Sequence, residues 1–188
     1  TYAGPFDIVV KDTPGPSMAL VPAWQGAQGH MLFTAPTVTR GRAATIHEAT
    51  HVFAPNANRF LAEGLAVYAH DHLGGPAAYP NFAAGLHALA GRLGQGIDLA
   101  ALDRLATPAR LQLPGLEERE AYIVAGSFVC FLIDTFGLAR FRELYALTPL
   151  LPGQRDAGPA ERWQRIFGLP LEALERRWRD AIVQSRNP

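Results

Sequence analysis

The chain contains one lysine, Lys11, and one cysteine, Cys130, among its 188 residues. A single cysteine excludes a disulfide within the chain, and its apolar surroundings predict a buried small side chain. The chain also lacks excess charge, because 17 basic and 17 acidic residues balance. This balance argues against nucleic acid or an anionic membrane surface as the main partner. The longest apolar stretch, Tyr122 to Ile133, is too short to be a transmembrane segment.

What the chain does contain is the pattern His-Glu-x-x-His, from His47 through Glu48 to His51. Residues four apart share one face of a helix, so the two imidazoles can point at a single spot. This spacing suits a zinc ion, with Glu48 beside it as the general base of a metal hydrolase. Glu63 would be the third protein ligand and would leave the fourth position open for water, which is the layout of a catalytic zinc site. The sequence predicts one Zn²⁺ held by His47, His51 and Glu63.

The alternative interpretation is a surface helix that carries two histidines and a solvated glutamate by chance. The residues around the motif favour a zinc helix over residues 42–54, because its remaining positions are largely apolar and Pro55 marks its end. Asn56 or Asn58 can cap a second helix over residues 58–72, whose second turn carries Glu63.

The segment Arg59–Tyr68, with Ala62-Glu63-Gly64 inside it, resembles the second-helix signature of gluzincin metallopeptidases. The likeness is closest to the bacterial peptidase MA-like domains, which share features with the thermolysin and aminopeptidase N families. Residues 122–137 resemble the helix that follows in those domains, and residues 167–178 resemble their closing helix. The resemblance covers about Met31 to Val183. It implies a zincin-like fold and a zinc peptidase, and it leads us to expect an exported bacterial protein, periplasmic or extracellular.

The chain departs from that family at two places. Eleven residues separate His51 from Glu63, which is short for gluzincins, and Val67 stands where the thermolysin branch has an aspartate that orients a zinc histidine. Such a partner fixes the tautomer of a histidine ligand, so a backbone carbonyl would have to replace it. The metzincin pattern does not fit, because Ala54 and Ala57 occupy the positions of its glycine and third histidine.

Tyr122 is the candidate donor to the tetrahedral oxyanion, a role that the resemblance suggests. Aminopeptidase N relatives use a tyrosine shortly before a glycine on the following helix, and Tyr122 precedes Gly126. The alternative is a core tyrosine, because the helix from Glu117 to Phe136 is apolar nearly all round.

The N-terminal residues predict strands at Phe6–Lys11 and Met31–Thr34, with a loop between Asp12 and Pro22. In gluzincins a strand before the zinc helix forms a sheet edge that pairs with substrate. If Met31–Ala35 is that edge, a peptide or protein substrate binds it extended, by strand addition.

The fold class expected is α+β and predominantly helical, in one domain over residues 1–188. Residues 1–40 form a small sheet region, followed by the zinc helix, the helix of the third ligand, and a helical half over residues 80–188. The expected helices of that half are Asn81–Leu93, Leu99–Leu105, Glu117–Phe136, Leu138–Ala146, Glu161–Phe167 and Leu171–Gln184, with a loop over Thr148–Pro159.

The leading hypothesis for function is a zinc-dependent peptidase. We expect an endopeptidase rather than an aminopeptidase, because the glycine-containing segment Gly26–His30 carries no glutamate to hold a substrate amine. Two alternatives stay open. One is a non-catalytic, zinc-stabilised module that binds a peptide or protein, although retention of Glu48 speaks against it. The other is a latent peptidase covered by its own Arg176–Arg179 segment, where Trp178 can instead anchor the core.

Overall fold

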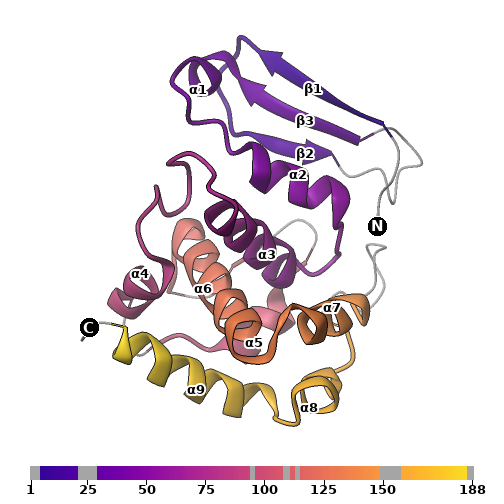
Figure 1. Cartoon of the computed structure of the whole chain (residues 1–188), viewed down its shortest axis with the longest axis vertical. Helices are drawn as coiled ribbons and strands as arrows, with labels where there is room; N and C mark the ends of the chain where they lie inside the picture. The colour runs from indigo at the N-terminus through magenta and orange to yellow at the C-terminus, as the bar shows by residue number, and fades with distance from the viewer. Residues whose placement is uncertain are drawn as a thin grey trace.

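A small N-terminal sheet, with one short helix beside it, packs on a second helix, and the other helices gather beneath them (Figure 1). The computed structural model describes residues 5–20, 29–93, 96–107, 111–112, 115–148 and 158–185. The strands are β1 (Phe6–Lys11), β2 (Met18–Leu20) and β3 (Gly29–Thr34). The helices are α1 (Ala35–Thr39), α2 (Thr45–Phe53), α3 (Arg59–His72), α4 (Leu86–Arg92), α5 (Leu99–Leu105), α6 (Glu118–Phe136), α7 (Leu138–Ala146), α8 (Arg162–Phe167) and α9 (Leu171–Gln184). The predicted α+β class with a mainly helical content is confirmed.

The sheet has the strand order β1-β3-β2. β1 runs parallel to β3, with Phe6 opposite Gly29, and β2 runs antiparallel to β3, with Ala19 opposite Met31. The prediction that Met31–Ala35 forms a sheet edge is therefore wrong. Both sides of β3 are paired, and Ala35 already belongs to α1. The edge next to α2 is β2, three residues that the sequence placed in a loop.

A small core joins the sheet to α2. Side chains alternate across a strand, so Met31 and Phe33 of β3 point to the same face. Both are buried there against Val52 of α2. The sheet and α2 thus form one unit with its own apolar contacts.

A second and larger core fills the helical half around α6, whose residues from Ala121 to Val129 are all buried. α3 crosses α6 closely. A Cβ at Gly64 would lie 2.5 Å from Val129 Cγ2, and a Cβ at Gly126 would lie 2.5 Å from Val67 Cγ1, so both glycines are required by the close approach. Val67 is therefore a packing residue of α3 against α6, which explains why an aspartate is not found at this position.

Most predicted helices of this half agree with the structure within a residue or two, and α4 is the exception. It begins at Leu86 rather than Asn81, because the Asn81 side chain donates to both carboxylate oxygens of Asp71 and to the carbonyl of Ala84. Phe82 and Ala83 then take positive φ angles of 51° and 65°, which no helix tolerates. The expected loop over Thr148–Pro159 lies largely outside the described residues.

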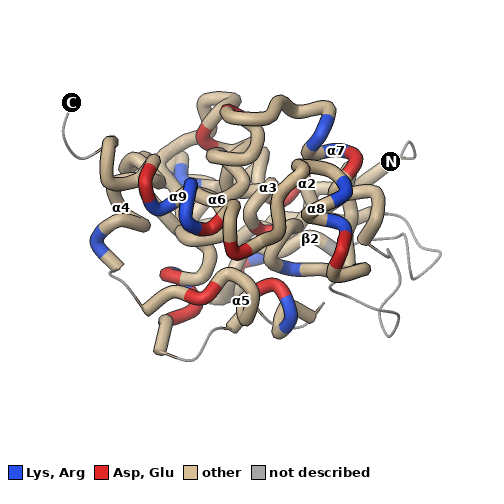
Figure 2. Tube along the Cα trace, turned by 90° about the horizontal axis from the view of Figure 1, so that it is seen from below, with Lys and Arg blue, Asp and Glu red and all other residues tan. Residues whose placement is uncertain are grey.

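Basic and acidic residues are interspersed in the view of Figure 2, in keeping with the balanced composition. Among the described residues, none of the helices has the length and apolarity needed to cross a membrane.

Candidate metal centre

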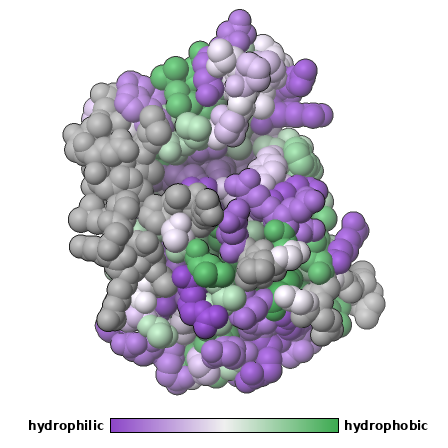
Figure 3. All heavy atoms as spheres, turned by 180° about the vertical axis from the view of Figure 1, so that it is seen from behind, coloured by the Kyte–Doolittle hydropathy of each residue, from purple (hydrophilic) through white to green (hydrophobic). Residues whose placement is uncertain are grey.

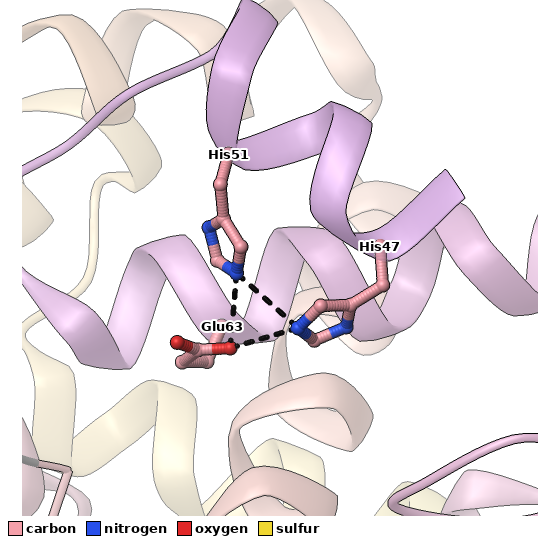
Figure 4. A group of neighbouring side chains, drawn as sticks. All are labelled: His47, His51 and Glu63. Atoms are coloured by element: carbon pink, nitrogen blue, oxygen red, sulfur yellow. Dashed lines mark hydrogen bonds and ion pairs between the residues drawn. The ribbon is translucent and has the colours of Figure 1, made fainter. Parts of the chain in front are cut away.

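Three predicted ligands meet between α2 and α3 (Figure 4). His47 and His51 project from α2 towards Glu63 on α3. The two Nε2 atoms are 3.2 Å apart, and Glu63 Oε2 lies 3.1 Å from His47 Nε2 and 3.2 Å from His51 Nε2. In the part of the chain that the structure describes, this is the sole group of three such side chains close enough to hold one metal ion.

The spacing of these atoms fits a small tetrahedral ion. Nitrogen and oxygen ligands about 2.0–2.1 Å from such an ion lie about 3.3–3.4 Å from one another. The observed edges of 3.1–3.2 Å are close to this, so the triangle matches one face of a coordination tetrahedron. Two imidazoles and one carboxylate are also the donor types that zinc prefers. The buried His47, His51 and Glu63 group can therefore hold a metal ion.

The short connection between α2 and α3 is held by asparagine side chains. Asn56 Oδ1 accepts from the backbone N–H of Asn58 at 2.9 Å, and Asn56 Nδ2 donates to the carbonyl of Tyr145. Asn58 is the N-cap of α3, since its side chain accepts from the N–H of Leu61 at 3.1 Å. Of the two predicted caps, Asn58 is the correct one, and Asn56 supports it.

Arg59 is a site residue that the sequence argument missed. Its Nη2 lies 2.5 Å from Glu63 Oε1 and donates to the Tyr122 hydroxyl at 2.6 Å. Arg59 thus occupies one oxygen of Glu63 and leaves Oε2 to face the histidines. The spacing of four residues between Arg59 and Glu63 on one helix was the signal that could have revealed it.

In the described part of the chain, no comparable partner supports His47. The Nδ1 atom of His47 is buried and has no hydrogen-bond partner among the described residues. The backbone carbonyl expected in place of the missing aspartate is therefore not found at His47. The polar support of the centre comes through Arg59 and Glu63 instead.

Glu48 lies beside the triad and is only 6% exposed. Burial raises the pKa of its carboxyl to about 7, while the charge on His47 lowers it and the Glu63 carboxylate raises it. A hydrogen bond from the backbone of Ala19 in β2 also lowers this pKa. A cation held by the triad would lower it further, because it favours the carboxylate. Before an ion binds, Glu48 is thus a carboxyl group able to exchange a proton near neutral pH.

The pKa of the Glu63 carboxyl is shifted in the opposite direction from that of Glu48. The pKa of this carboxyl is held well below its usual range, because neighbouring His47 and His51 more than offset the effect of burial. Glu63 is therefore ionised, as a metal ligand must be.

Tyr122 packs against His47. The two rings are stacked, with centroids 6.4 Å apart and planes 11° from parallel. Burial and the Glu63 carboxylate raise the pKa of the Tyr122 phenol, so it keeps its proton. Since its oxygen already accepts from Arg59, that proton is available to an acceptor in the cleft.

These side chains line a cleft of about 660 Å³. Figure 3 shows a hollow with hydrophilic residues on its floor. One wall includes Ser17 to Ala19 together with Arg40 and Arg42. The other includes Tyr79, Phe82, Glu118 and Tyr122. Its volume lies within the range of about 300–1,000 Å³ that is usual for ligand-binding clefts.

We compared the chain with models of protein families, with curated proteins and with solved structures, and none of the three comparisons found a match. The geometry of the site is therefore the basis for assigning its chemistry.

Proposed function

We propose that this protein is a zinc-dependent peptidase with a zincin-like fold. The observation that carries the proposal is the convergence of two histidines and a glutamate, in tetrahedral spacing, beside the buried carboxyl of Glu48. A structural metal site needs no general base, whereas hydrolysis does. The cleft leaves room for substrate above the three ligand atoms.

A zinc ion bound here would supply a Lewis acid that makes water more acidic and polarises the scissile carbonyl. Glu48 takes the proton from the attacking water and returns it to the leaving amine. Tyr122 donates its phenol proton in a hydrogen bond to the developing oxyanion. Arg59 holds both Glu63 and Tyr122 in position. β2 lies at the edge of the sheet and lines the cleft, where the backbone of Ala19 hydrogen-bonds Glu48 and so helps to position the general base.

The position of α9 bears on the latent alternative. Trp178 is fully buried in the larger core and donates to Ser127 Oγ at 2.9 Å. None of the residues that line the cleft comes from α9. The described part of the C-terminal segment therefore leaves the cleft open, which favours an active peptidase. Internal cleavage is favoured over removal of N-terminal residues, because the segment Gly26–His30 carries no glutamate to hold a substrate amine.

The test is cleavage of a diverse peptide mixture, read by mass spectrometry. We expect internal cuts with zinc-loaded protein, none after a chelator removes the metal, and recovery when zinc is added back. A zinc-binding module without catalysis would bind the metal with one ion per chain and cut nothing. That result would overturn the peptidase proposal and leave the metal centre in place.

Arg59→Met should weaken zinc binding about 10–100-fold, the usual effect of removing a group that orients a metal ligand. Turnover should fall as well, because Tyr122 loses the donor that fixes its hydroxyl. Zinc affinity is measured by competition with a coloured chelator. Tyr122→Phe is the matched comparison, since it should lower turnover about 10²–10³-fold and leave zinc affinity unchanged. Equal zinc affinity in Arg59→Met and the parent protein would contradict the role given to Arg59.

A further inference from the structure

The loop between α3 and α4, residues 74–85, exposes two aromatic side chains at the cleft. Tyr79 is 42% exposed and Phe82 is 51% exposed, and both line the cleft wall. Their rings meet edge to face, with centroids 6.5 Å apart. The Tyr79 ring also lies 5.6 Å from the Tyr122 ring. This aromatic pair is an apolar surface beside the group that we place in the reaction.

The backbone of this loop is strained where it presents Phe82. Phe82 and Ala83 both have positive φ, a region that side chains with a Cβ rarely adopt. Neither position is a glycine, which would relieve the strain. Strain of this kind persists where the surroundings enforce it, and it concentrates at binding and catalytic sites.

The surroundings enforce it here through several hydrogen bonds. The buried Asn81 side chain donates to Asp71 at 2.9 and 2.8 Å. The N–H of Phe82 donates to the Ala78 carbonyl at 2.7 Å, and Arg119 Nε donates to the Pro80 carbonyl at 2.7 Å. The loop is thus pinned at its base while its two rings stay uncovered. Binding a ligand to an apolar surface that is already fixed costs less conformational entropy than binding to one that must first become ordered.

Two charged side chains, Arg119 and Glu118, lie beside the aromatic pair. The Arg119 guanidinium lies 5.6 Å from the centre of the Phe82 ring and steadies it without hiding it. Glu118 lines the same wall, and its carboxylate adds to burial in raising the pKa of Tyr79 to about 12. The Arg119 guanidinium opposes this effect on the Tyr79 pKa, so charges of both signs flank the rings. An aromatic side chain can use the faces and edges of both rings.

We infer that Tyr79 and Phe82 form a subsite that binds an aromatic side chain of the peptide substrate. The inference rests on the proposed peptidase function and names its substrate class. Peptides with phenylalanine, tyrosine or tryptophan close to the scissile bond are then preferred over the same peptides with alanine or aspartate.

The test uses fluorescent peptides that are identical except for phenylalanine, alanine or aspartate scanned through each position. Binding to zinc-loaded Glu48→Gln is measured by anisotropy, and cleavage is measured with the parent protein. At one position we expect phenylalanine to bind about tenfold more tightly than alanine, consistent with one well-packed aromatic contact. Phe82→Ala and Tyr79→Ala should each remove most of that preference. Phe82→Leu should keep part of it, and Leu138→Ala, an exposed apolar residue on α7, is the matched control.

Each outcome decides a different point. Cleavage without an aromatic preference, or a preference that survives in Phe82→Ala and Tyr79→Ala together, overturns the subsite and leaves the peptidase proposal standing. If the protein neither cleaves nor binds any of the peptides, the subsite and the peptidase proposal are both overturned. Zinc content and circular dichroism of each variant show that a lost preference is not a lost fold.

Discussion

Glu48→Gln should lower peptide cleavage by about 10²–10⁴-fold, the range expected when a general base is removed. The amide has nearly the shape of the carboxyl group but cannot take a proton from water. Glu48 contributes no ligand atom to the triad, so one zinc ion per chain should remain bound. The ratio of kcat/KM between variant and parent, with zinc measured on the same samples, checks both statements.

Glu172→Gln makes the same chemical change at an exposed position on α9 and controls for preparation. Cleavage that survives in Glu48→Gln at the parent rate would remove Glu48 from the mechanism. Loss of zinc together with activity would show instead that the buried carboxyl supports the metal centre rather than the chemistry.

Arg162→Met should cost about 3–5 kcal/mol of unfolding free energy, because it leaves a buried carboxylate without its cation. Arg162 is 1% exposed, and its Nη2 lies 2.5 Å from both oxygens of Asp103. The same carboxylate accepts from Asn58 Nδ2 at 3.0 Å and from Trp163 Nε1 at 3.3 Å. These two neutral donors cannot replace a charge. Urea denaturation of parent and variant measures the difference.

The pH dependence gives a second readout. Burial already raises the pKa of Asp103 despite the opposing effect of Arg162. Without Arg162 this pKa rises further, so the folded variant binds a proton that the unfolded chain has released. The carboxyl then stabilises the fold at low pH, and this contribution is lost as pH rises through the folded pKa. The deficit of Arg162→Met relative to the parent should therefore be smaller at pH 5 than at pH 8. Equal deficits at both pH values would mean that Asp103 stays ionised and hydrated.

This pair also matters to the metal centre, because Asn58 joins Asp103 to the first turn of α3. Pairing Arg162→Met with Asp103→Leu removes both charges and should recover much of the stability. It also removes the acceptor of Asn58, so zinc binding in the double variant separates overall stability from the placement of Glu63.

The ligand triad could be predicted from the sequence because it depends on local rules. A spacing of four residues on a helix fixes the relative positions of His47 and His51 before any tertiary contact forms. Pro55 and the asparagine cap similarly bound the two helices. Glu63 was predicted as the third ligand from its place in the second turn of the following helix, and the structure brings all three side chains together.

The wrong predictions concern features that depend on contacts between residues far apart in the sequence. Met18–Leu20 sits in a segment rich in proline and glycine, and it becomes a strand by pairing with β3. The placement of β3 at an edge failed for the same reason, since chain order does not give sheet order. The start of α4 was wrong because Asn81 binds Asp71 on another helix. The contact of Arg59 with Tyr122 spans 63 residues and could not be predicted, although the spacing of Arg59 and Glu63 could.

Because the fold has two separate cores, the metal centre also connects two separately packed parts of the protein. His47 and His51 belong to the unit built on Met31, Phe33 and Val52, whereas Glu63 belongs to the helical half. A bound ion would link the sheet unit to the helical half, two parts of the fold that bury separate apolar cores. Part of its binding free energy would keep the sheet layer from detaching by itself. The ion would add to the hydrogen bonds that tie Ala54 and Asn56 to Tyr145, and together they would fix the width of the cleft.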